Sequence, residues 1–552
     1  ADPARVAQQV PLPQKITALV YPTIGCPSLV EPGGRLAPVL LLRDGGVTTD
    51  WRAFLRTAQD PVPQRYHLSP VGAGYDVASG TYVLAFDLPS WIPEDTFDLT
   101  VLSDGLAAGM DSQPNAVRVL RATSDFTFAH IADTQVGDPQ TAFPQKFDEV
   151  LRELKLRDPA VTLFGGDVCF GTDYTHEYVD NWEVMRKGGL ALAALPGNHD
   201  GYCWLDPQSP IASPVLDYDG LNFWRKTFGP TYYSFQWSSI RFVAINSYGG
   251  PTTRRNSLTL ANVNTGGHVD PFQLTWIEQQ AREATSLGQE MLVFLHHNPT
   301  KRVKPNGPAW PWNNSNVGLG DGTWNDAFSK QELLRIAMDH AACSWFFSGH
   351  SNRDEHKLTQ AATGTRTIHH VNTTTPCNDG NPYEGYRLVK VTGGRIAEVG
   401  LPPADVNSVP FPLGGNLFLT YLEPNDGTAS AVRAKVENLL LEPVDVTFKA
   451  ALWPDPRGFR TSSGTIREVG VAETGAHVAY VRVTVPATGT VTVAVEPDPT
   501  GQGARPAFRP GASWGSTSGG CQVGPGGSGL AGLLLVTALA CAVAFRVRRE
   551  GP

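Results

Sequence analysis

The sequence of 552 residues has no excess of basic residues, no paired cysteine motif and no internal repeat. Its 44 Lys and Arg residues are outnumbered by 53 Asp and Glu, and the formal net charge of −9 argues against a general nucleic-acid-binding protein. The seven cysteines show no C-x-x-C pair and no zinc-finger spacing, so they indicate neither a disulfide framework nor a thiolate metal site. A solenoid is not expected either, because no period of that kind is visible.

The chain is too long for one hydrophobic core, and its length suggests about two to four domains. Short alternating apolar stretches in residues 1–122 predict an N-terminal, Ig-like β-sandwich. Strand-like and helical patterns alternate over residues 124–401, which predicts an α/β domain. Alternating strands return over residues 405–498 and predict a second β-sandwich, followed by a Gly/Pro/Ser linker over residues 499–529.

A hydrophobic segment with a basic end follows this linker over residues 530–549. Its apolar part of about 16 residues would reach roughly 24 Å as a helix, which is near the lower limit for crossing a membrane. The arginines behind it fit retention on the cytoplasmic side of a membrane. We therefore expect a transmembrane or sorting segment, and the alternative is a buried C-terminal core helix.

Five apolar runs of strand length each end in a short polar cluster. The runs cover residues 126–131, 161–164, 190–195, 291–295 and 345–347. The clusters behind them are Asp133-Thr134-Gln135, Gly166-Asp167, Gly197-Asn198-His199-Asp200, His296-His297 and Gly349-His350-Ser351-Asn352. Open α/β sheets bind ligands beyond the carboxyl ends of their strands, so these five clusters predict one site.

The ordered set D-x-Q, G-G-D, G-N-H-D, H-H-x-P and G-H-x-N resembles the motifs of the calcineurin-like metallophosphoesterases. The usual pattern of that family is D-x-H, G-D, G-N-H-D/E, H and G-H-x-H. Residues 229–235 and 240–246 look like the strand pair between its third and fourth motifs, and residues 271–280 resemble the helix before the fourth. The resemblance implies a four-layer αββα catalytic domain over residues 124–401, flanked by the two β-sandwiches.

By this resemblance, the site holds two divalent metal ions that share the carboxylate of Asp167. One ion would be held by a set of carboxylate, amide and imidazole donors that suits Mn, Fe or Zn, namely Asp167, Asn198, His296 and His350. The other would be held by Asp133, Gln135, Asp167 and Asn352. The family normally has histidines in place of Gln135 and Asn352, so this second set offers oxygen donors only and favours a more weakly held Mn, Mg or Ca ion.

Two histidines of the motifs, His199 and His297, are not among the predicted metal ligands. His199 precedes Asp200, whose carboxylate can fix the imidazole tautomer, and the family assigns this histidine the donation of a proton to the leaving group. The alternative is that His199 only braces its loop. His297 follows the expected ligand His296 and either points away or lines the pocket. His356 is a weaker candidate to replace the histidine that is missing at Asn352.

Some neighbouring residues have weaker support. The aromatic stretch at residues 310–312, with Trp324, could wall a substrate pocket, although such residues more often pin a loop. Lys301 and Arg302 could neutralise phosphate, and a solvated surface is the more common role of such residues. Cys169 and Cys203 could form a disulfide bond if the protein is exported.

The expected function is metal-dependent hydrolysis of a small phosphomono- or phosphodiester by a metal-activated water, without binding of nucleic-acid polymers. The C-terminal order of Cys521, apolar segment and basic end resembles myxobacterial sorting tails. Together with an expected processed signal peptide, it indicates a periplasmic, surface-anchored or secreted protein. Two alternatives stay open: a catalytically weak or inactive metal- or phosphate-binding surface protein, suggested by Gln135 and Asn352, and an adhesion module.

Overall fold

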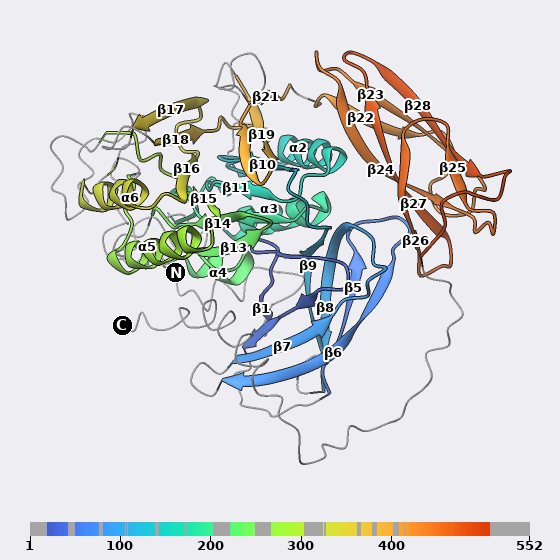
Figure 1. The fold of residues 1–552 in the computed structure, drawn as a ribbon, viewed down its shortest axis with the longest axis horizontal. Coiled ribbons are helices and arrows are strands. Elements are labelled where there is room, and N and C mark those ends of the chain that lie inside the picture. Colours follow the sequence, from blue (N-terminus) through green and yellow to red (C-terminus); the bar gives the residue numbers. More distant parts are fainter. Residues whose placement is uncertain are drawn as a thin grey trace.

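The computed structural model places three parts in order along the chain: an all-β part, an α/β part and a second all-β part (Figure 1). It describes residues 19–41, 50–76, 81–104, 106, 109–137, 143–171, 174–201, 221–248, 266–302, 324, 327–360, 366–377, 383–400, 408–412 and 414–507. The predicted hydrophobic segment at residues 530–549, Cys521 and Cys203 lie outside these residues. Within them, none of the helices combines the length and the apolar character needed to span a membrane.

The first all-β part is a nine-stranded sheet in the order β1-β4-β7-β6-β5-β8-β9-β2, with β3 paired to β7. Its strands are β1 (Leu19–Tyr21), β2 (Ser28–Val30), β3 (Arg35–Leu36), β4 (Val39–Leu41), β5 (Arg52–Thr57), β6 (Arg65–Asp76), β7 (Thr81–Asp87), β8 (Asp95–Leu102) and β9 (Met110–Val119). Leu40, Leu55, Leu84, Leu99 and Val117 from five of these strands share one buried cluster. Apolar residues of these strands therefore lie in a common core, and the Ig-like β-sandwich stays a prediction.

The α/β part contains two six-stranded sheets. The first has the order β12-β11-β10-β19-β20 with β21 beside β19, and its strands are β10 (Phe126–Ile131), β11 (Thr162–Phe164), β12 (Leu192–Ala194), β19 (Gly385–Thr392), β20 (Arg395–Glu398) and β21 (Val409–Pro410). The second has the order β13-β14-β15-β16-β18-β17, and its strands are β13 (Tyr233–Trp237), β14 (Ile240–Ala244), β15 (Glu290–Phe294), β16 (Cys343–Ser348), β17 (Glu355–Gln360) and β18 (Thr367–Asn372). The five predicted strands ahead of the polar clusters are β10, β11, β12, β15 and β16. Within each sheet, neighbouring members of this set run parallel.

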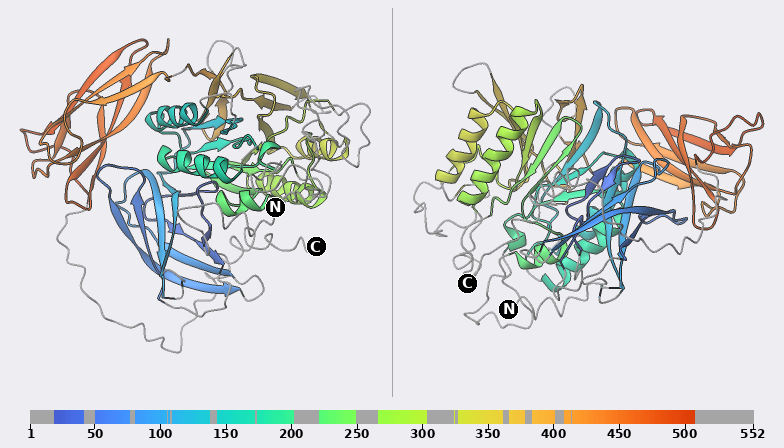
Figure 2. Two further views of the ribbon diagram at one scale, coloured as in Figure 1. Left: turned by 180° about the vertical axis from the view of Figure 1, so that it is seen from behind. Right: turned by 60° about the horizontal axis from the view of Figure 1, so that its bottom comes forward.

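The helices of this part are α2 (Phe143–Arg157), α3 (Tyr174–Gly188), α4 (Asn222–Thr227), α5 (Pro271–Ser286) and α6 (Ala327–Asp339), with the 3₁₀ turn η1 (His199–Gly201). Helix α5 begins at Pro271, directly after Asp270. The side chain of Asp270 caps the helix by accepting hydrogen bonds from the main-chain amides of Phe272 and Gln273. Figure 2 shows α5 and α6 as neighbouring green and yellow helices.

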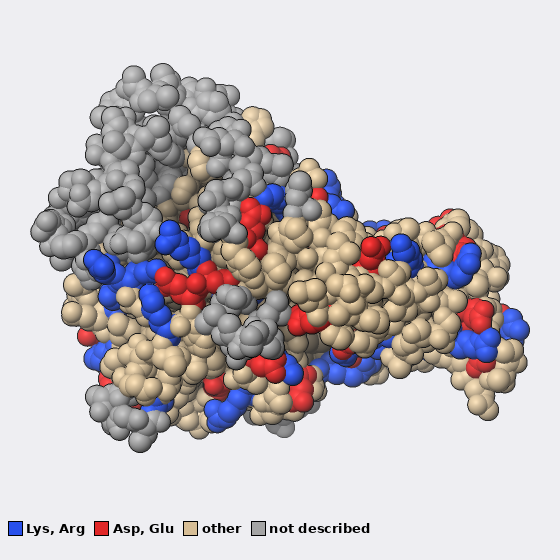
Figure 3. Space-filling view, turned by 90° about the horizontal axis from the view of Figure 1, so that it is seen from above, with Lys and Arg blue, Asp and Glu red and all other residues tan. Residues whose placement is uncertain are grey.

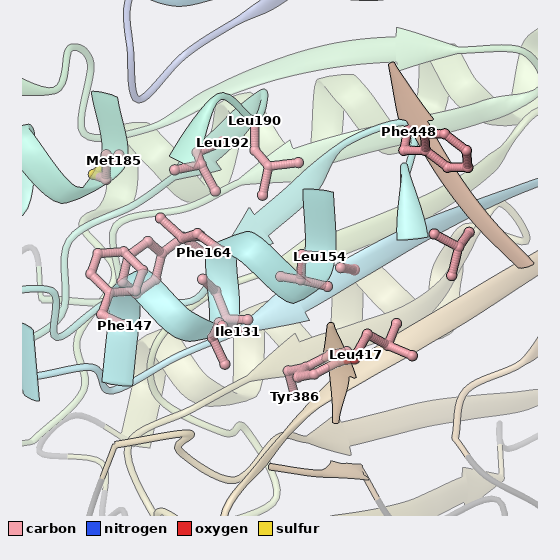
Figure 4. Close-up of a cluster of buried hydrophobic side chains, with 14 of the residues drawn as sticks. Ile131, Phe147, Leu154, Phe164, Met185, Leu190, Leu192, Tyr386, Leu417 and Phe448 are labelled. Atoms are coloured by element: carbon pink, nitrogen blue, oxygen red, sulfur yellow. The ribbon is translucent and has the colours of Figure 1, made fainter. Parts of the chain in front are cut away.

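Successive side chains of a strand point to opposite faces of its sheet. In the α/β part, one face of each sheet packs against the other sheet and the opposite face packs against helices. Phe128 of the first sheet and Phe242 and Phe347 of the second share one cluster, so these faces of the two sheets pack together. Ile131 and Phe164 point to the opposite face, where they meet α2 and α3 (Figure 4). On the second sheet, the corresponding opposite face contacts α5 and α6 through another buried cluster.

The last all-β part consists of two sheets, ordered β22-β23-β28-β25 and β24-β27-β26. Its strands are β22 (Leu417–Tyr421), β23 (Val432–Asn438), β24 (Val444–Leu452), β25 (Phe459–Thr461), β26 (Thr465–Val471), β27 (His477–Val485) and β28 (Thr490–Pro497). Val436 and Val493 of the first sheet and Val446 and Val481 of the second are fully buried in one cluster. The same cluster continues to α2, so the last part packs on the α/β part, as Leu417, Phe448 and Leu154 illustrate (Figure 4).

Ion pairs also join the three parts. Arg467 of β26 lies 2.9 Å from Glu94 of the first part and 3.1 Å from Asp158 behind α2, so one guanidinium contacts all three parts. Lys449 of β24 lies 2.7 Å from Asp60 and also contacts Asp95, both in the first part. Burial opposes the charge of Lys449, but the two carboxylates hold its pKa above the usual value.

The Lys449→Met variant should lose about 2–4 kcal/mol of the free energy of unfolding, because Asp60 and Asp95 would stay buried without their cation. Chemical denaturation measures this loss. The matched variant Lys435→Met removes an exposed lysine that pairs with Glu437 on the same part, and it should change stability by no more than about 0.5 kcal/mol. Equal effects of the two substitutions would contradict the role given to Lys449.

Candidate metal centre

The carboxyl ends of strands from both sheets meet at one place. Asp133 follows β10, Asp167 follows β11 and Asn198 follows β12 in the first sheet, while His296 follows β15 and His350 follows β16 in the second. Asp133, Asp167, Asn198 and His296 are each no more than 1 % exposed. Residues separated by more than two hundred positions in the sequence therefore share one buried centre.

Three donor atoms surround Nε2 of His296 in this centre. The Nε2 atom of His296 lies 3.0 Å from Oδ2 of Asp167, 3.0 Å from Oδ1 of Asn198 and 3.1 Å from Nδ1 of His350. Donor atoms about 2.1 Å from a common ion and about 90° apart would lie about 3 Å from one another. Asp167, Asn198 and His350 thus each lie at the spacing of neighbouring ligands from His296, and the four residues have donor types that suit a divalent cation.

The second predicted donor set is more open. Oδ1 of Asp133 lies 4.0 Å from Nε2 of His296, and the ligand atoms of Asp133, Asp167 and His296 all lie within 4.8 Å of one another. The main-chain amide of Gln135 donates a hydrogen bond to the main-chain carbonyl of Asp167. The segment that follows β10 therefore lies beside Asp167, whose carboxylate the two predicted donor sets share. The side chains of Gln135 and Asn352 stay predicted ligands of this second position.

The backbone of the centre is unusual in its torsion angles. Among the eleven non-glycine residues with positive φ in the described part of the chain, five belong to the predicted metal set: Asp133 (58°), Gln135 (44°), Asp167 (54°), His350 (68°) and Asn352 (51°). Left-handed conformations at residues other than glycine are costly and concentrate at functional sites. These turns at the strand ends let main-chain amides as well as side chains face the centre.

Two glycines are required by close packing at the carboxylates. A Cβ atom on Gly197 would lie 2.1 Å from Oδ1 of Asp167, and one on Gly349 would lie 2.4 Å from Oδ2 of Asp133. Both distances are far shorter than van der Waals contact, so no other residue fits without moving a carboxylate. The glycines of the G-N-H-D and G-H-x-N motifs therefore have a steric role.

The buried carboxyl groups of the centre and His296 compete for protons. Burial raises the pKa of Asp133 to about 8, and burial together with Asp167 raises the pKa of Asp200 to about 7. Burial also opposes the charges of Asp167 and His296, but each stabilises the other, so the pKa of Asp167 lies below its usual range and the pKa of His296 rises to about 9. A bound cation would relieve this competition for protons.

The structure corrects the expected pairing of His199 with Asp200. Nδ1 of His199 lies 2.6 Å from the carbonyl oxygen of Phe170, so this carbonyl fixes the imidazole tautomer. The buried carboxylate of Asp200 accepts hydrogen bonds from three main-chain amides, those of Val168 (3.0 Å), Cys169 (2.9 Å) and Gly197 (2.8 Å). Asp200 thus ties the second motif to the third, a role that sequence alone did not reveal.

His297 belongs to the centre and does not point away from it. Its ring lies 4.5 Å from the ring of His350, and His296, His297 and His350 form a group whose ligand atoms lie within 4.8 Å of one another. Nδ1 of His297 lies 2.9 Å from Oγ of Ser247, which fixes the ring. Successive side chains point to opposite faces only within a strand, and β15 ends at Phe294. The side chains of His296 and His297 can therefore both face the centre.

The weaker candidates do not join the donor cluster. Nε2 of His356 lies 3.0 Å from Nδ1 of His369, so His356 belongs to a different histidine pair. Lys301 forms an ion pair of 2.7 Å with Glu355. Trp324 is fully buried and donates to the carbonyl of Asn298, which supports the role of pinning a loop. Cys169 is a buried free thiol, while residues 310–312 and Cys203 lie outside the described residues.

Comparison with known proteins identifies the class of the site. Residues 126–353 match the family model of the calcineurin-like phosphoesterases. The resemblance predicted from the five motifs is therefore confirmed for this stretch of the chain, which contains every predicted metal ligand.

Solved structures offer more distant similarities. A dimetal phosphatase from Danio rerio is 15% identical with a TM-score of 0.32, and the match covers 48% of this chain and 93% of that one. A structure described as PhoD is 9% identical with a TM-score of 0.39, covering 87% and 92% of the two chains. No curated protein sequence matches the chain.

The Gly197→Ala variant should lower the affinity for Mn²⁺ by about tenfold or more, because the new methyl group must displace the carboxylate of Asp167. Metal content after dialysis against a fixed Mn²⁺ concentration measures the effect. Gly74→Ala is the control, because a Cβ at Gly74 meets no atom within 4 Å. Unchanged metal content in Gly197→Ala would show that Asp167 does not hold an ion.

The metal-free protein should become less stable as the pH rises from about 5 to about 9. Asp133 and Asp200 hold protons in the folded state well above their ordinary pKa of 3.8, and these protons are lost as the pH approaches 8. The charge of His296 contributes stability below its ordinary pKa of 6.5, and this contribution is lost as the pH rises through about 9. The pKa of Asp167 is lowered, so its contribution to the free energy of unfolding is present above its ordinary pKa of 3.8 and is lost only at lower pH. Asp167 therefore does not change the trend between about pH 5 and about pH 9.

Melting temperatures measured with a chelator and with excess Mn²⁺ across this pH range test the prediction. The ions compete with protons for the same groups, so Mn²⁺ should raise the melting temperature most at the alkaline end. A metal-free protein that becomes more stable toward about pH 9 would contradict the charge balance described here.

Proposed function

We propose that the chain is a metal-dependent phosphoester hydrolase whose catalytic domain has the four-layer αββα arrangement of its family. The observation that carries the proposal is the convergence of Asp167, Asn198 and His350 on Nε2 of His296 at 3.0–3.1 Å. Structural metal sites in proteins are usually closed by Cys and His ligands, whereas carboxylate, amide and imidazole ligands together are suited to transition metals that activate water. The family match supports the same reaction class.

Two divalent ions are proposed, one held by Asp167, Asn198, His296 and His350 and one by Asp133, Gln135, Asp167 and Asn352. Mn, Fe or Zn suits the first set, and Mn, Mg or Ca suits the second. Such ions supply an activated water and neutralise phosphoryl oxygens when they are bound. The second set lacks imidazole, so its ion is expected to be the more weakly held one.

His199 is proposed as the proton donor to the leaving oxygen. Because Nδ1 of His199 contacts the carbonyl of Phe170, Nε2 is the ring atom that can hold and release a proton toward a substrate. The amide of His199 donates to Oδ1 of Asp167 at 2.8 Å, so the histidine is fixed relative to the shared carboxylate. The carboxylate of Asp200 stabilises this arrangement, because it accepts hydrogen bonds from three main-chain amides around Asp167 and Asn198.

The proposed substrate is a small phosphomono- or phosphodiester. Acidic and basic side chains are interspersed on the face shown in Figure 3, and no broad basic area lies among the described residues of that face, which does not favour a nucleic-acid polymer. We also propose an exported protein, periplasmic, surface-anchored or secreted. The support for this location is the sequence of residues 499–549, with its linker, apolar run and basic end.

A second candidate function is metal or phosphate binding at the cell surface with little or no catalysis. The observation that favours it is the pair of neutral amides, Gln135 and Asn352, in place of two histidines. This candidate predicts at most one tightly held ion for each chain and no hydrolysis above background.

Hydrolysis of chromogenic phosphomono- and phosphodiesters with added Mn²⁺ separates the two candidates. Asp167→Ala should lose both bound metal and turnover, because the shared carboxylate is gone. His199→Asn should keep its metal and lose roughly 10²–10⁴-fold in kcat, because only proton donation is removed. His67→Asn changes an exposed histidine of the first part and is the control. Absence of hydrolysis by the wild-type protein, with no more than one ion bound, would favour the binding protein.

A further inference from the structure

Just before the last all-β part, a short segment of the chain contacts the loop that carries His350 and Asn352. Residues 408–412, which we call the connector, include β21, whose Val409 and Pro410 pair with Tyr386 and Gly385 of β19. Beside the connector lies the loop of residues 349–354, which presents His350 and Asn352. No motif in the sequence links these two segments.

A single carboxylate joins the connector to this loop. Asp354, two residues after Asn352, accepts hydrogen bonds from the amide and the hydroxyl of Ser408, both at 2.6 Å. It also accepts from the guanidinium of Arg387 at 2.8 Å and from the amide of Thr374 at 3.0 Å. Ser408 and Arg387 are fully buried, so water does not compete for these bonds.

The rest of the loop is held from the same side. The hydroxyl of Thr374 lies 2.8 Å from the carbonyl oxygen of Tyr383 and 3.1 Å from that of Asn352, which share its one proton. The side-chain amide of Asn372 donates to the carbonyl of Arg353 at 2.7 Å. The guanidinium of Arg387 also donates to the carbonyl of Asn372 at 3.0 Å. The loop therefore has little freedom as long as Arg387 and Ser408 hold Asp354.

The connector is itself anchored beyond Ser408. The amide of Asn416, just before β22, donates to the buried carboxylate of Glu153 in α2 at 2.6 Å. The hydroxyl of Tyr386 donates to the same carboxylate at 2.5 Å, and Phe411 packs against the ring of Tyr386. The entrance to the last all-β part is thus fixed to the α/β part on both sides of the connector.

We propose that Ser408 is a positioning residue of the metal centre, which acts through Asp354 to fix the loop that carries His350 and Asn352. This inference rests on the proposed function. Oxygen donors without imidazole bind a transition metal weakly, so affinity at the second position depends on how well its ligands are held in advance. The last all-β part, which continues from the connector, thereby contributes to metal binding without supplying a ligand.

Titration of the full-length metal-free protein with Mn²⁺, followed by electron paramagnetic resonance, tests this inference. The wild-type protein should bind two ions, with a spectrum that changes from isolated to spin-coupled Mn²⁺ as the second ion binds. Ser408→Ala should weaken binding of the second ion by about tenfold and binding of the first ion by less, because His350 is the one ligand of the first set that lies on this loop. Asp354→Asn, which removes the charge facing Arg387 but keeps the shape of the side chain, should act in the same direction.

Ser239→Ala is the matched control, because it removes a hydroxyl that donates to the carbonyl of Gly394 far from the metal loop. It should leave both affinities unchanged. Hydrolysis by Ser408→Ala should recover when Mn²⁺ is raised about tenfold, whereas a protein damaged in its fold would not recover. Circular dichroism and the melting temperature establish that each variant is folded.

Equal second-ion affinity in folded Ser408→Ala, Asp354→Asn and the wild type would overturn the role of Ser408 and leave the proposed function intact. A loss of affinity as large in Ser239→Ala would also overturn it, since the effect would then be general. A wild-type protein that binds no more than one Mn²⁺ would overturn both this inference and the two-ion centre. The variants and the wild type therefore separate the two failures.

Discussion

The burial of three carboxylates in one small volume is the constraint on which the rest of the centre depends. Asp133, Asp167 and Asp200 are each about 1 % exposed, and a buried anion is tolerated only when hydrogen bonds or opposite charges replace its water. Asp200 satisfies this need with three main-chain amides, Asp133 with the amide of His350, and Asp167 with the amide of His199 and the ring of His296. The fold supplies these donors at the ends of strands, where amides are no longer used by a sheet.

This constraint explains why the strand ends are strained. A strand that simply continued would direct its amides to the neighbouring strands, whereas a left-handed residue turns the main chain toward the centre. Asp133, Asp167 and His350 adopt such a conformation, and Gly166, Gly197 and Gly349 lie beside them. The same turns that satisfy the carboxylates also gather the donor atoms around His296, so charge compensation and metal binding have one structural origin.

The sequence predicted the strands and their clusters well because both signals are local. Apolar runs ending in Asp133, Asp167, Asn198, His296 and His350 required only the period of buried strands and the rule that ligands gather at carboxyl ends. The helical patterns predicted within residues 124–401 correspond to helices such as α2 and α6, because apolar periodicity is also a local signal. The role of Asp200 was mistaken because its partners are main-chain amides, which carry no sequence signal. The direction of His297 depended on where β15 ends, and strand boundaries are not encoded sharply.

The contact between Ser408 and Asp354 could not have been predicted, since it joins ordinary polar residues that lie 54 positions apart and belong to no motif. This contact shows that the predicted ligands are held in position in two different ways. His296 stands directly at the end of a central, fully buried strand, and its position follows from the sheet itself. Asn352 stands on a loop whose position follows from Arg387, Thr374 and the connector. Asp167, Asn198 and His296 of the stronger set therefore stand at the ends of core strands, whereas Asn352 depends on polar contacts around a loop that it shares with His350. Loss of imidazole and dependence on a supporting loop thus coincide at Asn352, where the position of the ligand has the most influence on whether an ion is held.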